Sequence, residues 1–142
     1  MTPYMMRYVD QETNVLFTAM CRLISAMPDV ELGQDALGET ILVSCHMLCR
    51  GLAAIYPEAE VRDGQFMGKY DHSWLTFMDF IIDPYPVAML GGPVLLHAVN
   101  LAPWSRLYSP GDVPAVRYPH FPAACAKVME AVRETHLHLC RR

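Results

Sequence analysis

The sequence of 142 residues has no apolar run close to the roughly 20 residues that a membrane-spanning helix needs. Its first residues lack the basic stretch, the apolar core and the small-residue cleavage site of a secretory signal. Charged residues are scarce, at 18%, while hydrophobic residues reach 53%, and this balance excludes a disordered chain and a coiled coil. We therefore expect one domain over residues 1–142 of a soluble, cytoplasmic protein with no membrane partner.

Basic residues are also in deficit, because 11 of them stand against 15 acidic residues and leave a net charge of −4. A surface that follows nucleic-acid phosphates normally has a positive excess or stripe, so no nucleic-acid partner is expected. Phosphate-binding glycine loops and a Gly-x-Ser-x-Gly elbow are absent. The five cysteines are odd in number and irregularly spaced, which favours free thiols over a disulfide framework. Nothing in the sequence indicates the oligomeric state.

Helical periodicity marks three segments of the chain. Asp10 is a predicted N-cap, and apolar residues recur behind it at helical spacing until Pro28. The residues 29–40 hold two glycines and four acidic residues and are predicted to form a loop. A second apolar helix is predicted within 41–56 and a third over 122–139.

Between the second and third helices the period changes to that of strands. We expect extended segments at 61–67, 71–77, 80–83 and 93–100. The residues 102–122 contain five prolines and no clear period, which predicts a long loop of the kind that often carries function. Two helices, then several strands, then a helix indicate an α+β domain rather than alternating βαβ units.

Three residues carry a possible chemistry: Cys45 in the second helix, His72 on a strand and Asp83 at the end of the next strand. Thiol-based acyl transfer needs a thiolate to attack a carbonyl, an imidazole to move protons and a carboxylate to orient that imidazole. A helix N-terminus favours the thiolate form and supplies N–H donors for an oxyanion. Cys45 has this advantage if the helix begins close to it, and loses it if the helix begins at Thr40.

The register of one hairpin decides whether His72 and Asp83 can meet. A tight hairpin between 71–77 and 80–83 pairs residues whose numbers have a constant sum. A sum of 155 places the two side chains directly opposite, and a sum of 157 makes them diagonal neighbours on one face. A sum of 156 puts them on opposite faces. Two of the three nearest registers therefore permit the contact.

The order of these pieces resembles the transglutaminase-like branch of the papain-like cysteine enzymes. The matching pieces are Ser44-Cys45, Gly51-Leu52-Ala53-Ala54, Val61-Arg62, His72-Ser73-Trp74-Leu75 and Ile81-Ile82-Asp83-Pro84. The resemblance implies a papain-like α+β core in which a Cys-bearing helix packs on an antiparallel sheet. It also implies that Cys45 is the nucleophile, His72 the base and Asp83 the orienting acid, with no cofactor. The chain departs from the family pattern in a shorter interval between Cys45 and His72.

The function that the resemblance implies is cysteine-dependent acyl transfer, above all the hydrolysis of an amide or isopeptide bond by a peptidase, amidase or deamidase. Its substrate would be a protein, a peptide or a small amide. Transfer to an amine, as in cross-linking, is the alternative within enzymes. A non-catalytic binding module that keeps the fold is the alternative from another class.

Aromatic and arginine side chains on loops often supply substrate contacts. From the proline-rich segment we expect Trp104, Arg106 or Tyr108 to border the cleft, with a position at the edge of the core as the alternative for Trp104. Trp74 shares its strand face with His72 and can wall the site, although a core position is also open to it.

Two other interpretations of the cysteines remain open. Cys49 lies one helical turn after Cys45 and competes with it as nucleophile, and Cys45 itself can be a buried small hydrophobe. A zinc site is disfavoured, because Cys45 and His46 point about 100° apart on a helix. The second group of possible ligands, His136-x-His138-x-Cys140, lies at the end of the chain. We expect no metal.

Overall fold

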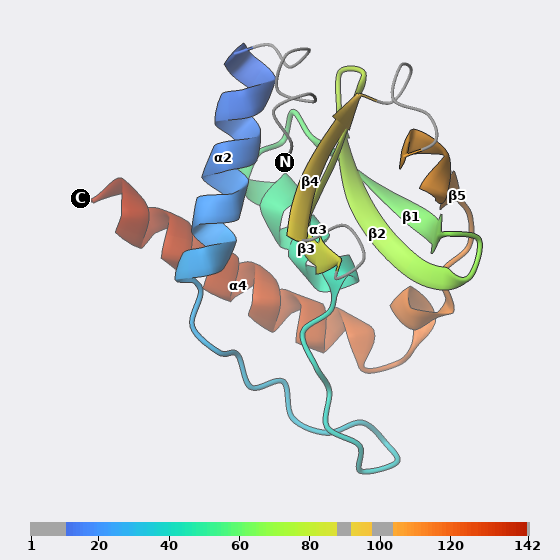
Figure 1. Cartoon of the computed structure of the whole chain (residues 1–142). Coiled ribbons are helices and arrows are strands. Elements are labelled where there is room, and N and C mark those ends of the chain that lie inside the picture. Colours follow the sequence, from blue (N-terminus) through green and yellow to red (C-terminus); the bar gives the residue numbers. More distant parts are fainter. Residues whose placement is uncertain (1–10, 88–91, 98–103, 142) are drawn as a thin grey trace.

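The structure, a computed structural model, describes residues 11–87, 92–97 and 104–141. Within these ranges the chain is an α+β domain with three α-helices and one antiparallel sheet of five strands (Figure 1). The expected N-cap Asp10 lies outside the described residues. No helix among the described residues combines the length and the apolar character needed to cross a bilayer. The helices are α2 (Gln11–Ala26), α3 (Cys45–Ile55) and α4 (Phe121–Cys140).

The strands lie side by side in the order β4-β3-β2-β1-β5. They are β1 (Glu60–Phe66), β2 (Tyr70–Phe77), β3 (Phe80–Val87), β4 (Gly92–His97) and β5 (Tyr108–Pro110). Two short 3-10 helices, η2 (Trp104–Leu107) and η3 (Pro114–Arg117), flank β5.

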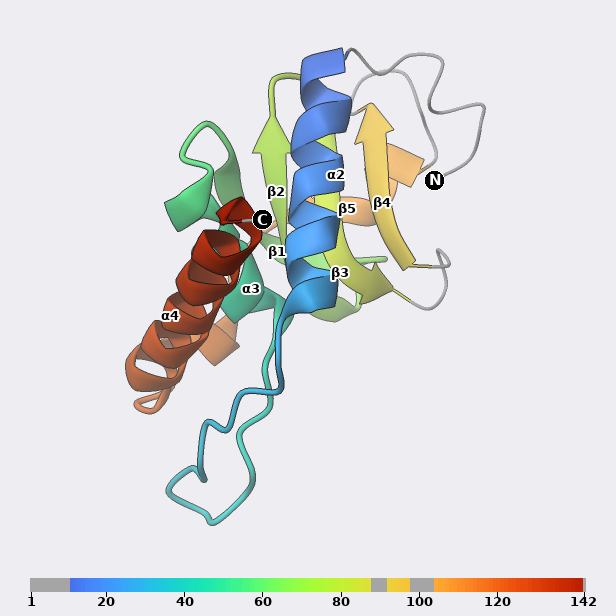
Figure 2. The ribbon, with the colours of Figure 1, turned by 90° about the vertical axis from the view of Figure 1, so that its left-hand side faces the viewer.

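The helices α2 and α3 pack against one face of this sheet, and α4 packs on α3 and α2 from the outside (Figure 2). The larger core lies between these elements. Period 3.6 along the helices and period 2 along the strands direct their apolar side chains into the same layer. In β2 the side chains that join it are Leu75 and Phe77, which alternate with those of the opposite face. The fully buried members of this core include Met20, Leu23, Cys49, Leu52, Leu75, Ile82, Leu95, Val128 and Val132.

The opposite face of the sheet holds a second, smaller core of Phe66, Trp74, Ile81, Val94 and Tyr108. These five residues come from β1, β2, β3, β4 and β5 in turn. The 3-10 helix η2, which leads into β5 at one edge, also contacts β4 at the other edge. The sheet therefore curls around the smaller core, and its two edge strands approach each other.

The helix α3 begins at Cys45, four residues later than the earliest start that the apolar pattern allows. Ser44 has an extended backbone (φ −115°, ψ 164°), and its Oγ accepts a hydrogen bond from the backbone N–H of Met47 at 3.4 Å. This is the geometry of a serine N-cap. Because Ser44 stops the helix here, Cys45 occupies the first helical position, which is the position that favours a nucleophile.

The hairpin between β2 and β3 has the register sum of 157, with Leu75 paired to Ile82 and Phe77 to Phe80. One of the two permissive registers is thus confirmed. The turn has two residues, and Met78 adopts a left-handed backbone with φ 54°, as two-residue hairpin turns require. The register places His72 and Asp83 on the same face as diagonal neighbours.

The expectation of a long irregular loop over 102–122 is wrong. In its described part, from residue 104 on, this segment contains η2, β5, η3 and the first two residues of α4. A three-residue strand is too short to show alternation in the sequence, and Pro110 argues against a strand. The strand forms because Tyr108 pairs with Phe66 and Pro110 with Gly64 at the edge of the sheet.

Gly64 is expected to be essential for the pairing of β5 with β1. A Cβ atom on Gly64 would lie 2.0 Å from the carbonyl oxygen of Ser109. Gly64→Ala should therefore push β5 away and lower the free energy of unfolding by about 1–3 kcal/mol, as measured by urea denaturation. Gly111→Ala is the matched control, because the added carbon there meets the movable end of Gln65. Equal losses in the two variants would contradict this role of Gly64.

Candidate active site

Cys45 lies where the N-terminus of α3 abuts β2. Its side chain is 7% exposed, and its Sγ accepts a hydrogen bond from the backbone N–H of Ser73 at 3.4 Å. Cys45 and His46 occupy the first two helical positions. The N–H groups of such positions have no acceptor within their own helix. They and the positive end of the helix dipole favour negative charge at this point.

His72 and Asp83 are joined as the hairpin register predicts. The Nε2 of His72 lies 2.7 Å from Oδ2 of Asp83, and both side chains are buried. The Cys45 sulfur lies near enough to the imidazole to raise the pKa of His72. The three sequence-predicted residues therefore lie together, with His72 bound to Asp83 and close to the Cys45 sulfur.

Asp83 is held by three donors. Besides His72, the phenol of Tyr108 donates to Oδ2 at 2.8 Å, and the backbone N–H of Tyr85 donates to Oδ1 at 3.3 Å. Tyr108 reaches Asp83 from β5, across β1 and β2, on the inner side of the curled sheet. A fully buried carboxylate without such donors would be costly. The three donors keep Asp83 oriented toward His72.

The electrostatics of the site favour a protonated His72. Burial acts to lower the pKa of His72. The hydrogen bonding and the charges of Asp83 and Cys45 outweigh this effect and raise the pKa from the ordinary 6.5 to about 10. An opposite charge within hydrogen-bond distance favours the charged form in this way. At neutral pH the site therefore holds an imidazolium between a carboxylate and a sulfur.

We expect the raised pKa of His72 to depend on Asp83. In an NMR titration His72 should titrate near pH 10, and Asp83→Asn should lower its pKa toward or below the ordinary 6.5 because burial then acts without the opposing charge. The resonance of the exposed His138 should not differ between the two proteins. An equal pKa of His72 in the original protein and in Asp83→Asn would show that Asp83 does not control this pKa.

Cys49 is a poor alternative nucleophile in this structure. Its side chain is fully buried in the core between α3 and the sheet. Burial, together with the nearby charges of Cys45 and Asp83, raises the pKa of the Cys49 thiol well above its usual value. A buried thiol of this kind is inert.

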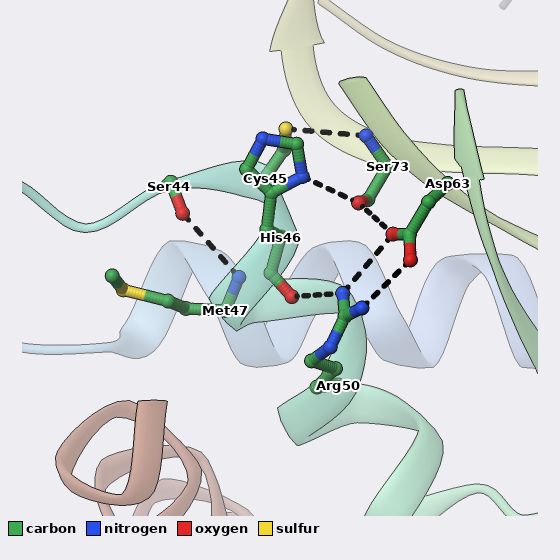
Figure 3. Close-up of polar contacts among 7 residues, drawn as sticks. All are labelled: Ser44, Cys45, His46, Met47, Arg50, Asp63 and Ser73. Atoms are coloured by element: carbon green, nitrogen blue, oxygen red, sulfur yellow. Dashed lines mark hydrogen bonds and ion pairs between the residues drawn. The ribbon is translucent and has the colours of Figure 1, made fainter. Parts of the chain in front are cut away.

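A chain of polar contacts fixes α3 against β1 and β2 next to Cys45 (Figure 3). The Nδ1–H of His46 donates to Oγ of Ser73 at 2.6 Å, and that hydroxyl donates to Oδ1 of Asp63 at 2.5 Å. Arg50 binds both carboxylate oxygens of Asp63, at 3.2 and 2.8 Å, and the carbonyl oxygen of His46. The network holds Ser73, whose backbone N–H contacts the Cys45 sulfur.

The charge states within this network follow from its contacts. Burial raises the pKa of Asp63, but the hydrogen bonds from Arg50 and Ser73 and the charge of Arg50 outweigh it and lower the pKa below its usual value. Burial also lowers the pKa of His46, although Asp63 opposes this shift. An ionised Asp63 and a neutral His46 are the states in which every contact of the chain is satisfied.

The residues expected to contact substrate differ in their placement. Trp74 is 2% exposed and lies parallel to the His72 ring, with ring centroids 6.4 Å apart, so it supports His72 from the core. Tyr108 is 7% exposed and bound to Asp83, so it positions the acid. Both are members of the smaller core, and their contact with substrate stays a prediction. Arg106 is exposed on η2, while the side chain of Trp104 lies outside the described part of the structure; for these two, substrate contact stays a prediction.

Among the residues that the structure describes, no group of three or more His, Cys, Asp or Glu side chains is arranged to hold a metal ion. The Nδ1 of His46 is bound to Ser73. On α4, the sulfur of Cys140 lies 3.6 Å from Nε2 of His136.

No pattern in the sequence predicted a role for Arg50, Asp63 or Ser73, or the hydrogen bond from Tyr108 to Asp83. Alternation does place Ser73 on the face of β2 opposite His72, which is the face toward α3. The pairing of Asp63 with Ser73 depends on the β1–β2 register, which no local pattern specifies.

No family model, no curated protein and no solved structure matches the chain.

Proposed function

We propose that this chain is a cysteine-dependent acyl-transfer enzyme with a papain-like, transglutaminase-like core, and that it hydrolyses an amide or isopeptide bond. The observation that carries the proposal is the placement of His72, which is bound to Asp83 at 2.7 Å and lies near enough to the Cys45 sulfur for both groups to raise its pKa. This arrangement has the parts of a nucleophile–base–acid triad.

In the first step the Cys45 thiolate attacks the substrate carbonyl carbon while His72 is protonated. The C=O electron pair moves onto oxygen, and the backbone N–H groups at the start of α3 are the donors placed to stabilise this oxyanion. When the tetrahedral intermediate collapses, the C–N bond breaks and His72 gives its proton to the leaving amine. The acyl group remains on sulfur as a thioester.

In the second step the neutral His72 takes a proton from a water molecule, and the resulting hydroxide attacks the thioester carbonyl. The C–S bond then breaks, the acid is released and the thiolate–imidazolium pair returns. Asp83 orients the imidazole in both steps by binding its Nε2, and Tyr108 and the Tyr85 N–H hold the carboxylate in place. An amine in place of water would give the cross-linking variant of the same reaction.

A second candidate function is a non-catalytic binding module with an idle triad. The low exposure of Cys45 and His72, at 7% for each, favours this candidate. It differs from the enzyme in one accessible property, the reactivity of the thiol.

Residue-specific alkylation by iodoacetamide at pH 7 tests the proposal, with the sites and rates read by peptide mass spectrometry. The reagent is small enough to reach a largely buried sulfur. We expect Cys45 to react faster than the other buried thiols, Cys49 and Cys125, because an imidazolium stabilises its thiolate. A Cys45 as inert as Cys49 would instead assign the chain to the non-catalytic candidate.

A further inference from the structure

An arm of residues 27–44 joins α2 to α3 and projects away from the rest of the domain (Figures 1 and 2). Its tip is closed by backbone hydrogen bonds from Ile41 to Gly33 and from Asp35 to Glu39, each 2.9 Å long. The Asp35 carboxylate caps the tip by accepting from the N–H groups of Leu37 and Glu39. The arm is therefore an ordered element that leads directly into Cys45.

A cavity of about 590 Å³ lies between the two limbs of the arm and the adjoining ends of α2 and α3. Its apolar lining includes Met27, Ile41, Val43 and Leu48. Val43 and Leu48 flank Cys45 in the chain, at two residues before it and three after it, although Cys45 itself does not line the cavity. An apolar cavity of this size beside a candidate nucleophile suits the side chain of a substrate.

The backbone of the limbs offers a second means of recognition. Within the described residues, backbone pairing between the two limbs is confined to the tip, at Gly33–Ile41 and the bridge of Gln34 with Thr40. Below the tip the limbs have no regular secondary structure with each other. Backbone outside such pairing can hydrogen-bond to an extended peptide, whose alternate side chains then enter pockets. An extended peptide is the ligand that uses both the limbs and the cavity.

The charge of the arm specifies the peptide further. The arm contains four acidic residues and no basic residue. Asp35 is used by its own turn, but Asp29 and Glu31 are exposed and line the cavity. An apolar cavity with a negative rim complements an apolar side chain with positive neighbours.

We propose that the arm binds an extended peptide segment in which a bulky apolar side chain enters the cavity and adjacent lysine or arginine residues pair with Asp29 and Glu31. The inference rests on the proposed function, because it makes such a segment the part of the substrate that anchors it beside Cys45.

Equilibrium binding of fluorescein-labelled peptides, measured by fluorescence anisotropy, tests the inference without requiring any reaction. The probe is Gly-Lys-Leu-Lys-Gly; one comparison peptide has glycine in place of leucine, and another has glutamate in place of both lysines. We expect each change to weaken binding by about tenfold or more, because it removes either the buried side chain or the charge complement. Raising the salt concentration from about 0.1 M to about 1 M should also weaken the binding of the lysine peptide to the unmodified protein.

The double variant Asp29→Lys/Glu31→Lys should bind the lysine-containing probe about tenfold more weakly than the original protein does. Glu58→Lys, an equally exposed acidic position outside the arm, should leave its binding unchanged. Equal binding of the three peptides, no binding of any, or an equal loss in Glu58→Lys would overturn the inference.

Alkylation of Cys45 separates failure of this inference from failure of the proposed function. If Cys45 reacts rapidly but the peptides bind without preference, the arm has no part in recognition and the triad stands. If the lysine peptide binds as expected but Cys45 is inert, the proposed function falls, and with it the role of the arm as a substrate site.

Discussion

Replacing His72 with glutamine is expected to slow the alkylation of Cys45 by iodoacetamide at pH 7 by about tenfold to thirtyfold. An ordinary cysteine is only a few per cent thiolate at pH 7, and a positive charge beside a thiol makes it more reactive by stabilising the thiolate. The site supplies that imidazolium, because Asp83 and Cys45 raise the pKa of His72 to about 10 against the effect of burial. Glutamine keeps a polar side chain of similar reach but carries no positive charge.

The same protein contains its own control for this experiment. Cys140 is exposed on α4 and should react at one rate in both proteins. Circular dichroism checks the folding of His72→Gln, which we expect to be kept because the change leaves Asp83 with Tyr108 and the Tyr85 N–H as donors. Equal alkylation of Cys45 in the two folded proteins would show that His72 does not activate the thiol.

The second large effect is expected from Cys45→Ala, which should reduce the hydrolysis of p-nitrophenyl acetate by at least about a thousandfold. The variant removes the atom that accepts the acyl group, and loss of a nucleophile that acts with its base costs about as much as loss of the whole triad. The same change should lower stability by only about 1 kcal/mol, since a buried side chain becomes slightly smaller.

Cys49→Ala is the matched control for this loss. It removes a thiol from the same helix, one turn further on, and also leaves a small gap in the core. Its hydrolysis rate should stay within a few-fold of the original, because the Cys49 thiol has a pKa raised well above its usual value and does not ionise. Loss of activity in Cys49→Ala, with activity kept in Cys45→Ala, would transfer the role of nucleophile to Cys49.

The parts of the site that the sequence predicted depend on local rules. Alternation along β2 and the parity of the hairpin register place His72 and Asp83 on one face, and the observed register sum of 157 is one of the two that permit their contact. The start of α3 at Cys45 also had a local signal, because Ser44 is a favoured N-cap. The apolar residues at 41–43 extended the helical pattern in front of Ser44 and so concealed this N-cap signal.

The parts that the sequence did not predict depend on contacts between distant segments. Tyr108 holds Asp83 only because the three-residue strand β5 pairs with β1. That pairing requires glycine at position 64, since any side chain there would collide with Ser109. The contact of Asp63 with Ser73 requires both the β1–β2 register and the packing of α3. Periodicity reports which face a residue occupies, but not which residue from another segment it meets.

The proposed thioester can be tested directly by trapping it. The protein is mixed with p-nitrophenyl acetate at pH 7, quenched with acid while hydrolysis proceeds, and its acetyl group is located by peptide mass spectrometry. A cysteine acyl-transfer mechanism predicts one acetyl group per molecule on Cys45, absent from Cys45→Ala and decaying as acetate is released. Release of p-nitrophenol with no acetyl group on Cys45, or with acetyl only on the exposed Cys140, would contradict it.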